Sequence, residues 1–242
     1  MTLNPLFVKL RAHTEQLNKK MRTKTLLLTA AFVAAGVASS MAQSNVYSLN
    51  VVGYVNVTIP ANSFAMLSNP LLGTSNDYNS LLTGFPITTT KVYEWDPVGA
   101  QYVIYTKRAA GFSGYDGHAV NPGVGFFVQN TSANPITNTF VGTVLQGTNS
   151  ISYLSGGAFS AIASPAPLSG GIETTLGVPA VNGDKLYQWD VVGQQYVIVT
   201  RRATAWSGGE PQIGVSANLG PAEGFFYTST AGGTWNQTFT VH

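Results

Sequence analysis

Few side chains in this sequence are spaced for acid–base or nucleophilic chemistry. Beyond residue 42 there are two histidines, His118 and His242, and neither stands in a metalloprotease motif. The sequence has no Gly-x-Ser-x-Gly elbow, phosphate-binding loop or dinucleotide fingerprint. Glu94 and Asp96 could form a hydrolytic carboxylate pair, but Gln188 replaces Glu94 in a second copy of this segment. We therefore predict that the protein is not an enzyme, with a carbohydrate-active hydrolase as the weakest alternative.

Metal-ligating residues are also sparse. The chain has no cysteine, so it has no disulfide, no thiolate metal site and no cysteine nucleophile. Asp77 and Asp116 are isolated acids in segments rich in Asn and Gly. Calcium takes six to eight oxygen ligands, usually from several carboxylates, and such loop acids more often form Asx turns. We predict no metal and no cofactor.

Aromatic side chains that recur along the chain are better candidates for a binding site, because flat rings can stack on sugars or polymer backbones. Phe112 and Trp206 lie in segments with Gly and Ser, where binding residues are often displayed. Trp95 and Trp189 are also ligand-binding candidates, but their hairpin context favours burial in a core. Two further pairs recur, Tyr93 with Tyr187 and Tyr102 with Tyr196.

The basic residues beyond residue 42 are ordered in pairs, Lys91 with Lys185, Lys107 with Arg201 and Arg108 with Arg202. In a hairpin they gather at the open end. Arg108 and Arg202 are therefore candidates for binding an anionic glycan or an envelope phosphate group. The competing interpretation is a solvated cluster at the strand ends.

Residues 1–42 have the pattern of a targeting segment. Basic residues precede an uncharged apolar run of about 14 residues, and Ser40 and Ala42 supply small side chains before Gln43. A permanent membrane helix needs about 20 residues. We predict a signal peptide that is cleaved after Ala42, preceded by an upstream extension over residues 1–20, with an uncleaved anchor as the alternative.

Removing this segment reverses the sign of the net charge. The formal charge of the whole chain is +2, whereas the part from Gln43 onward holds six basic and nine acidic residues, a net charge of −3. This balance argues against nucleic acid as a partner. Only 9 % of the residues are charged, so Ser, Thr, Asn and Gly must cover much of the surface. Export without disulfides favours a bacterial envelope or extracellular protein over a eukaryotic secreted one. We predict that the protein is secreted or lies in the cell envelope, in the periplasm or on the outer surface, of a Gram-negative-type bacterium.

The remainder of the chain is an internal duplication. Residues 91–108 align with residues 185–202 at an offset of 94, with 12 of 18 positions identical. Gly-Phe-Phe at residues 125–127 recurs at residues 224–226. We predict two modules, at residues 43–144 and 145–242.

Each module has the sequence pattern of an all-β fold. Short β-branched and aromatic runs alternate with Gly, Pro, Asn and Ser, which favours a β-sandwich or barrel-like module. Asp96 and Gly99 are typical of a type I hairpin turn, and Asp190 and Gly193 repeat them. We expect each glycine to adopt the left-handed conformation that brings the strands back into register.

The opening Val46-Tyr-Ser-Leu-Asn-Val-Val-Gly-Tyr-Val55 and the succession Asn-Pro, Tyr-x-Trp-Asp, Gly-Phe-Phe resemble secreted tandem β-module proteins of verrucomicrobial bacteria. More loosely, the module is similar to β-sandwich modules of secreted Bacteroidetes proteins. The resemblance covers residues 46–242 and implies export and architecture, but no activity. The second copy departs from it, with Ser164 in place of Asn69 and Ala222-Glu223 in place of Gly123-Val124.

Taken together, these patterns predict an exported, non-catalytic structural or interaction protein of the cell envelope or extracellular space. Its candidate partner is a polysaccharide or another envelope polymer. The alternative is a surface or matrix component that self-associates through exposed strand edges. We expect no nucleic acid partner and no stable membrane span after cleavage.

Overall fold

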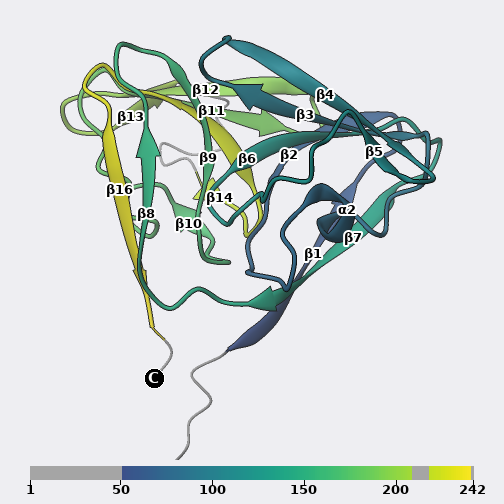
Figure 1. Ribbon diagram of the computed structural model, residues 1–242. Coiled ribbons are helices and arrows are strands. Elements are labelled where there is room, and N and C mark those ends of the chain that lie inside the picture. Colours follow the sequence, from purple (N-terminus) through teal and green to yellow (C-terminus); the bar gives the residue numbers. More distant parts are fainter. Residues whose placement is uncertain (1–50, 209–217, 241–242) are drawn as a thin grey trace, which may run out of the picture. The chain divides into compact units, whose positions relative to one another are not determined.

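The structure is a computed structural model that describes residues 51–208 and 218–240. Apart from helix α2 (Tyr78–Leu81), its regular elements are short strands, and every strand pairing in this part of the chain is antiparallel (Figure 1). The predicted all-β class is therefore confirmed. The predicted leader, residues 1–42, and His242 lie outside the described residues.

The first half of the described chain builds one five-stranded sheet and one two-stranded ribbon. The sheet has the order β2 (Ser63–Ser68), β6 (Gly125–Asn130), β3 (Thr90–Asp96), β4 (Gln101–Arg108), β5 (Gly111–Ser113). The ribbon pairs β1 (Val52–Ile59) with β7 (Ile136–Thr143).

The second half builds sheets with the corresponding order. Its five-stranded sheet runs β9 (Phe159–Ala163), β15 (Gly224–Thr228), β11 (Lys185–Asp190), β12 (Gln195–Arg201), β13 (Trp206–Gly208). Its ribbon pairs β8 (Gly147–Tyr153) with β16 (Gly233–Phe239), and a short pair joins β10 (Gly170–Gly171) to β14 (Asn218–Leu219). The predicted module boundary lies in the link between β7 and β8, but the described residues of both halves belong to one compact unit.

Each half is a sandwich with its own hydrophobic core. Along β7, Ile136, Asn138 and Phe140 are buried, while the residues between them are exposed, as expected for a strand with one face covered. Phe140 and Phe126 meet in the first core, and Trp235 and Phe225 meet in the second. Burying a large apolar side chain contributes about 1.5–3 kcal/mol, so both cores hold without a disulfide.

The glycines of the two hairpin turns do not adopt the predicted backbone conformation. The carboxylates of Asp96 and Asp190 accept hydrogen bonds of 2.9 Å from the N–H groups two residues later. The left-handed residues are Ala100 and Gln194, with φ of 50° and 52°, so the expected conformation of Gly99 and Gly193 is wrong. A Cβ at Gly99 or Gly193 would lie 2.6 Å from a carboxylate oxygen of Asp96 or 2.5 Å from one of Asp190, so a larger residue would have to displace the carboxylate that forms the turn.

Candidate binding site: paired aromatic clefts

The two Gly-Phe-Phe segments place aromatic rings on both faces of their sheets. Because side chains alternate along a strand, Phe126 and Phe225 enter the two cores, whereas Phe127 and Phe226 point to the other face. There the two five-stranded sheets meet, and Phe127 and Phe226 join Met66 in a third buried cluster. The glycine of each segment has no side chain, so the backbones of the two halves can approach each other closely at this seam.

Contacts across the seam are reciprocal. The indole Nε1 of Trp95 donates to the carbonyl of Phe159 at 3.0 Å, and the indole Nε1 of Trp189 donates to the carbonyl of Phe64 at 3.0 Å. Reciprocal contacts of this kind are the mark of a two-fold relation between equivalent surfaces. The hydroxyls of Tyr102 and Tyr196, 3.3 Å apart, join equivalent positions of the two halves.

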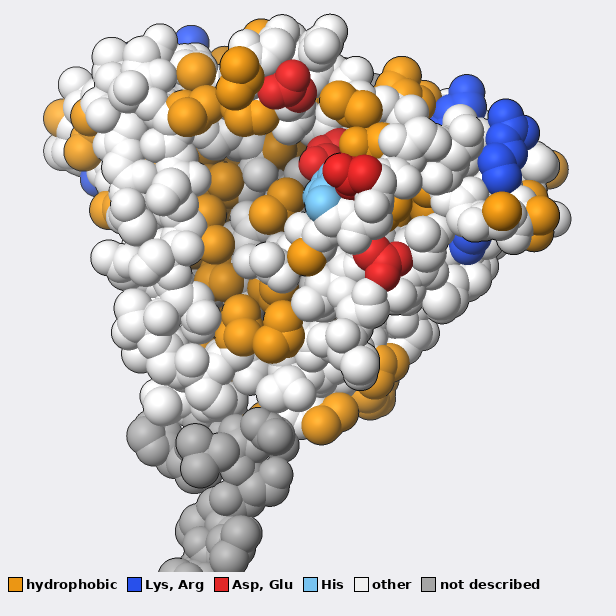
Figure 2. Space-filling view, viewed as in Figure 1, with side chains coloured by type: hydrophobic (Ala, Val, Ile, Leu, Met, Phe, Trp, Pro, Cys, Tyr) orange, Lys and Arg blue, Asp and Glu red, His pale blue; other side chains and the backbone are white. Residues whose placement is uncertain are grey.

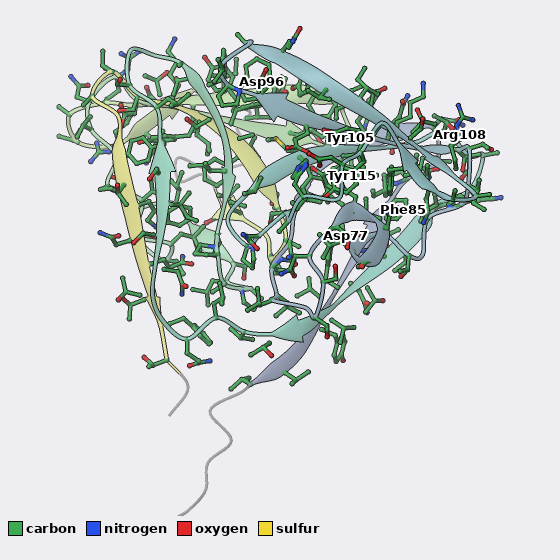
Figure 3. The ribbon with its side chains drawn as sticks, viewed as in Figure 1. Asp77, Phe85, Asp96, Tyr105, Arg108 and Tyr115 are labelled. Carbon is green, nitrogen blue, oxygen red and sulfur yellow. The ribbon has the colours of Figure 1, made fainter. Side chains whose placement is uncertain are left out.

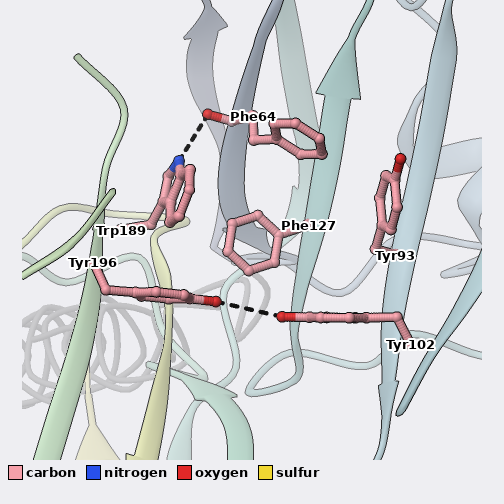
Figure 4. Close-up of a pocket in the computed structure, with 6 residues that line it drawn as sticks. All are labelled: Phe64, Tyr93, Tyr102, Phe127, Trp189 and Tyr196. Atoms are coloured by element: carbon pink, nitrogen blue, oxygen red, sulfur yellow. Dashed lines mark hydrogen bonds between the residues drawn. The ribbon is translucent and has the colours of Figure 1, made fainter. Parts of the chain in front are cut away.

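Two aromatic clefts flank this tyrosine pair. The first cleft has a volume of about 300 Å³ (Figure 4) and the second about 230 Å³. Tyr102 and Tyr196 line both clefts and are 38 % and 36 % exposed, so ring surface is open to solvent. The first cleft is completed by Phe64, Tyr93, Phe127 and Trp189, and the second by Phe159, Tyr187, Phe226, Trp95 and Ile198.

The polar atoms of the clefts are uncharged hydroxyls. Tyr93 donates to Oε1 of Gln129 at 2.7 Å. Burial raises the pKa of Tyr102, and burial together with the Tyr102 hydrogen bond raises the pKa of Tyr196. Both hydroxyls therefore stay protonated over the ordinary pH range. The arrangement can hold a flat, neutral molecule between aromatic rings and hydrogen-bond its edge.

Compared with protein-family models, curated proteins and solved structures, the chain matches none of them. In the described residues there is no helix long and apolar enough to cross a membrane.

The structure places Trp189 in the first cleft and Trp95 in the second, but Phe112 and Trp206 lie elsewhere. The latter two are each 5 % exposed and belong to the first and second cores. The indole Nε1 of Trp206 also donates to Glu173 at 2.8 Å. Neither ring is accessible to a polymer, because each lies on the inward face of a three-residue strand.

The candidate arginines do not join the clefts. Arg108 lies at the end of β4 (Figure 3). It is six residues beyond Tyr102, which is about 20 Å along a strand. Arg202 donates from Nε to the hydroxyl of Ser207 at 3.1 Å. Their neighbours have structural contacts: Lys107 donates to the carbonyl of Leu82, and Arg201 forms an ion pair with Glu173.

A group of ionisable residues in the first half was not predicted. Both carboxylate oxygens of Glu94 lie 3.0 Å from Nε2 of His118, and the hydroxyl of Tyr78 donates to one of them at 3.1 Å. Nδ1 of His118 lies 2.5 Å from Asp116. Asp116 also accepts from the His118 N–H, which is the Asx turn expected of it. No group of residues in the described ranges has the geometry of a metal site.

The charge of His118 should make stability depend on pH. Burial lowers the pKa of His118, but its hydrogen bond to Asp116 and the charge of Glu94 outweigh burial and raise it. A raised pKa contributes stability that is fully present below the unfolded-state value of about 6.5 and lost as pH rises through the folded-state value. We expect His118→Asn to be less stable than the unmodified protein at pH 5.5, by less than about 1 kcal/mol because the side chain is 37 % exposed.

Urea unfolding at pH 5.5 and pH 9 checks this. The difference between the two proteins should shrink at the higher pH, where the imidazole is neutral. A difference of the same size at both values would show that the charge of His118 contributes nothing.

Proposed function

We propose that this protein is an exported, non-catalytic binding protein of the cell envelope or extracellular space, which holds a polysaccharide in its two aromatic clefts. The observation that carries the proposal is the duplication of a solvent-open aromatic cleft on both sides of Tyr102 and Tyr196. A single cleft could be an accident of packing, whereas two equivalent ones suit a ligand that itself repeats.

The chemistry of the clefts favours a neutral polymer of sugar rings. The C–H faces of such rings are apolar and pack on aromatic rings, while their hydroxyls can bond to tyrosine hydroxyls. No Lys or Arg lines either cleft, which argues against a phosphate or nucleic acid backbone. Two weak sites on one chain that can be engaged together gain avidity.

The same lining supports binding over turnover. Neither cleft, in the part of the chain that the structure describes, is lined by a carboxylate, an imidazole or a thiol. Most glycoside hydrolases use a pair of carboxyl groups that flank the bond they cleave. The residues that line the two clefts therefore offer a ligand mainly aromatic rings and neutral hydroxyls.

Removing both shared tyrosines should weaken binding strongly. We expect Tyr102→Ala/Tyr196→Ala to weaken retention on cellulose or chitin by about a hundredfold, because each ring contributes stacking surface to both clefts. Tyr102→Phe/Tyr196→Phe keeps the ring faces and should retain most of the affinity. Depletion isotherms on the two insoluble polysaccharides, together with cellohexaose and chitohexaose in solution, measure the change.

Tyr54→Ala is the matched control, because Tyr54 is 74 % exposed on β1 and lines neither cleft. It should bind as the unmodified protein does. If none of these glycans is retained, the binding proposal fails. Elution of the unmodified protein as large, concentration-dependent species would then favour the self-associating component.

A further inference from the structure

A third cavity, of about 270 Å³, borders Trp95 at the seam between the two halves. The hairpin β3–β4, the loop before β6 and residues of β8 and β9 line it. Figure 2 views the side on which the one described histidine, His118, and neighbouring carboxylates lie beside a hollow with apolar side chains. Unlike the aromatic clefts, this pocket is lined by a carboxylate and two hydroxyls, from Glu94, Ser152 and Ser160.

The equivalent place in the second half has different side chains and contacts. Gln194 accepts a hydrogen bond from the N–H of Phe64 at 2.8 Å and donates to the Phe64 carbonyl at 3.1 Å. Its counterpart in the first half is Ala100, which has no amide to do the same. Val191, the counterpart of Pro97, packs against the first core. The pocket therefore distinguishes the second cleft, which Trp95 lines, from the first.

Glu94 is a fixed hydrogen-bond acceptor at the wall of this pocket. Its carboxylate is held by His118 and Tyr78, and 24 % of the side chain is exposed. A carboxylate that is oriented before the ligand arrives loses little entropy on binding. An ionised carboxylate also forms stronger hydrogen bonds to hydroxyl groups than a neutral acceptor does.

Ser160 supplies the complementary donor. It is 6 % exposed, and its oxygen accepts a hydrogen bond of 2.9 Å from the N–H of Leu154. Among the described residues no acceptor receives the proton of this hydroxyl. Buried polar hydrogens are usually satisfied, so a ligand oxygen is the natural partner in a pocket that Ser160 lines.

We propose that this pocket is a sugar subsite, which takes the hydroxyl edge of one ring whose apolar face packs on Trp95. In it Glu94 accepts from a ligand hydroxyl and Ser160 donates to a ligand oxygen. The inference rests on the proposed function, because Trp95 also lines the second aromatic cleft. Its consequence is that the two clefts, although equivalent in their aromatic rings, have unequal affinities.

Calorimetric titration of the full chain with cellohexaose and with chitohexaose tests the inference. The unmodified protein should show one tighter and one weaker site for at least one hexamer. Glu94→Gln should weaken the tighter site by about tenfold, the equivalent of one charge-assisted hydrogen bond, and leave the weaker site unchanged. Ser160→Ala, which removes only the hydroxyl donor, should act on the same site.

Glu223→Gln is the matched control, because Glu223 is the carboxylate that Gln188 binds in the second half and it lines neither cleft nor the pocket. It should leave both affinities unchanged. Two equal sites in the unmodified protein, or equal losses at both sites in Glu94→Gln, would overturn the inference and leave the proposed function standing. Failure of both hexamers and both insoluble polysaccharides to bind would remove the proposed function and this inference with it.

Discussion

Replacing Gly224 with alanine is expected to lower the free energy of unfolding by about 3 kcal/mol. An added Cβ would lie 2.6 Å from the carbonyl oxygen of Leu67 and 3.2 Å from Cα of Gly125. Both are backbone atoms at the seam, where the N–H of Ser68 donates to the carbonyl of Ala222 at 2.9 Å. The strands must separate to admit the methyl group, because no flexible side chain can yield. Equilibrium unfolding in urea measures the loss.

Gly53→Ala is the control for the glycine effect itself. Gly53 lies within β1, and a Cβ there would meet Val144 and Leu71 at 3.6 and 3.7 Å, which are ordinary contact distances. This substitution should leave stability within about 0.5 kcal/mol of the unmodified protein. If Gly224→Ala proves as stable as Gly53→Ala, the two halves do not touch at this seam.

The elements that local patterns define could be predicted from the sequence. Alternation of residue types and the Asp-x-x-Gly turns predict the strands of the two hairpins, β3–β4 and β11–β12. The sequence repeat accounts for why both halves have the same strand order. Which face of each sheet meets the other half could not be predicted, because both faces of the Gly-Phe-Phe strand carry a phenylalanine. Contacts between segments that are distant in the chain determine which face is covered.

The aromatic candidates show the same division between local and long-range information. Trp95 and Trp189 were expected to be core residues by their context, and the structure places them between the sheets, at the edge of the clefts. Phe112 and Trp206 were expected in open loops, but each lies on a short strand whose inward face closes a core. Gly and Ser neighbours indicated a loop, whereas β5 and β13 pair with β4 and β12, the strands just before them, and their aromatic rings pack into cores built from distant parts of the chain.

The acidic residue that each half has near the seam could not be recognised from the sequence, because the two halves have it at different positions. Gln188 replaces Glu94 in the second half, and this difference argued against a shared acidic residue. In the structure Glu223, at the position of Val124, accepts from Gln188 at 2.7 Å, and burial raises its pKa. Each half therefore has one carboxylate near this place, supplied by a different strand or loop. Only the three-dimensional structure shows that these two positions are neighbours, because they lie far apart in the chain.

Phe127→Ala is expected to cost about 3–5 kcal/mol of unfolding free energy and to weaken glycan binding at the same time. Phe127 is 5 % exposed, and its ring centroid lies 5.1 Å from that of Trp189 and 6.5 Å from that of Phe226. The ring therefore supports the aromatic cluster between the sheets and forms one wall of the first cleft. Removing it leaves a void into which Trp189 and Tyr196 can turn, so both cleft geometry and packing are lost. Urea unfolding and hexamer titration on the same preparation measure the two effects.

Phe140→Ala separates these two consequences. Phe140 is 1 % exposed in the first core and lines neither cleft, so its loss should cost a similar unfolding free energy. Because the halves remain joined through the aromatic cluster, hexamer affinity should stay close to that of the unmodified protein wherever the variant is folded. If Phe140→Ala weakened binding as much as Phe127→Ala, general loosening of the fold would explain both results. If only Phe127→Ala weakened it, the cluster between the sheets would be both what joins the halves and what forms the binding surface.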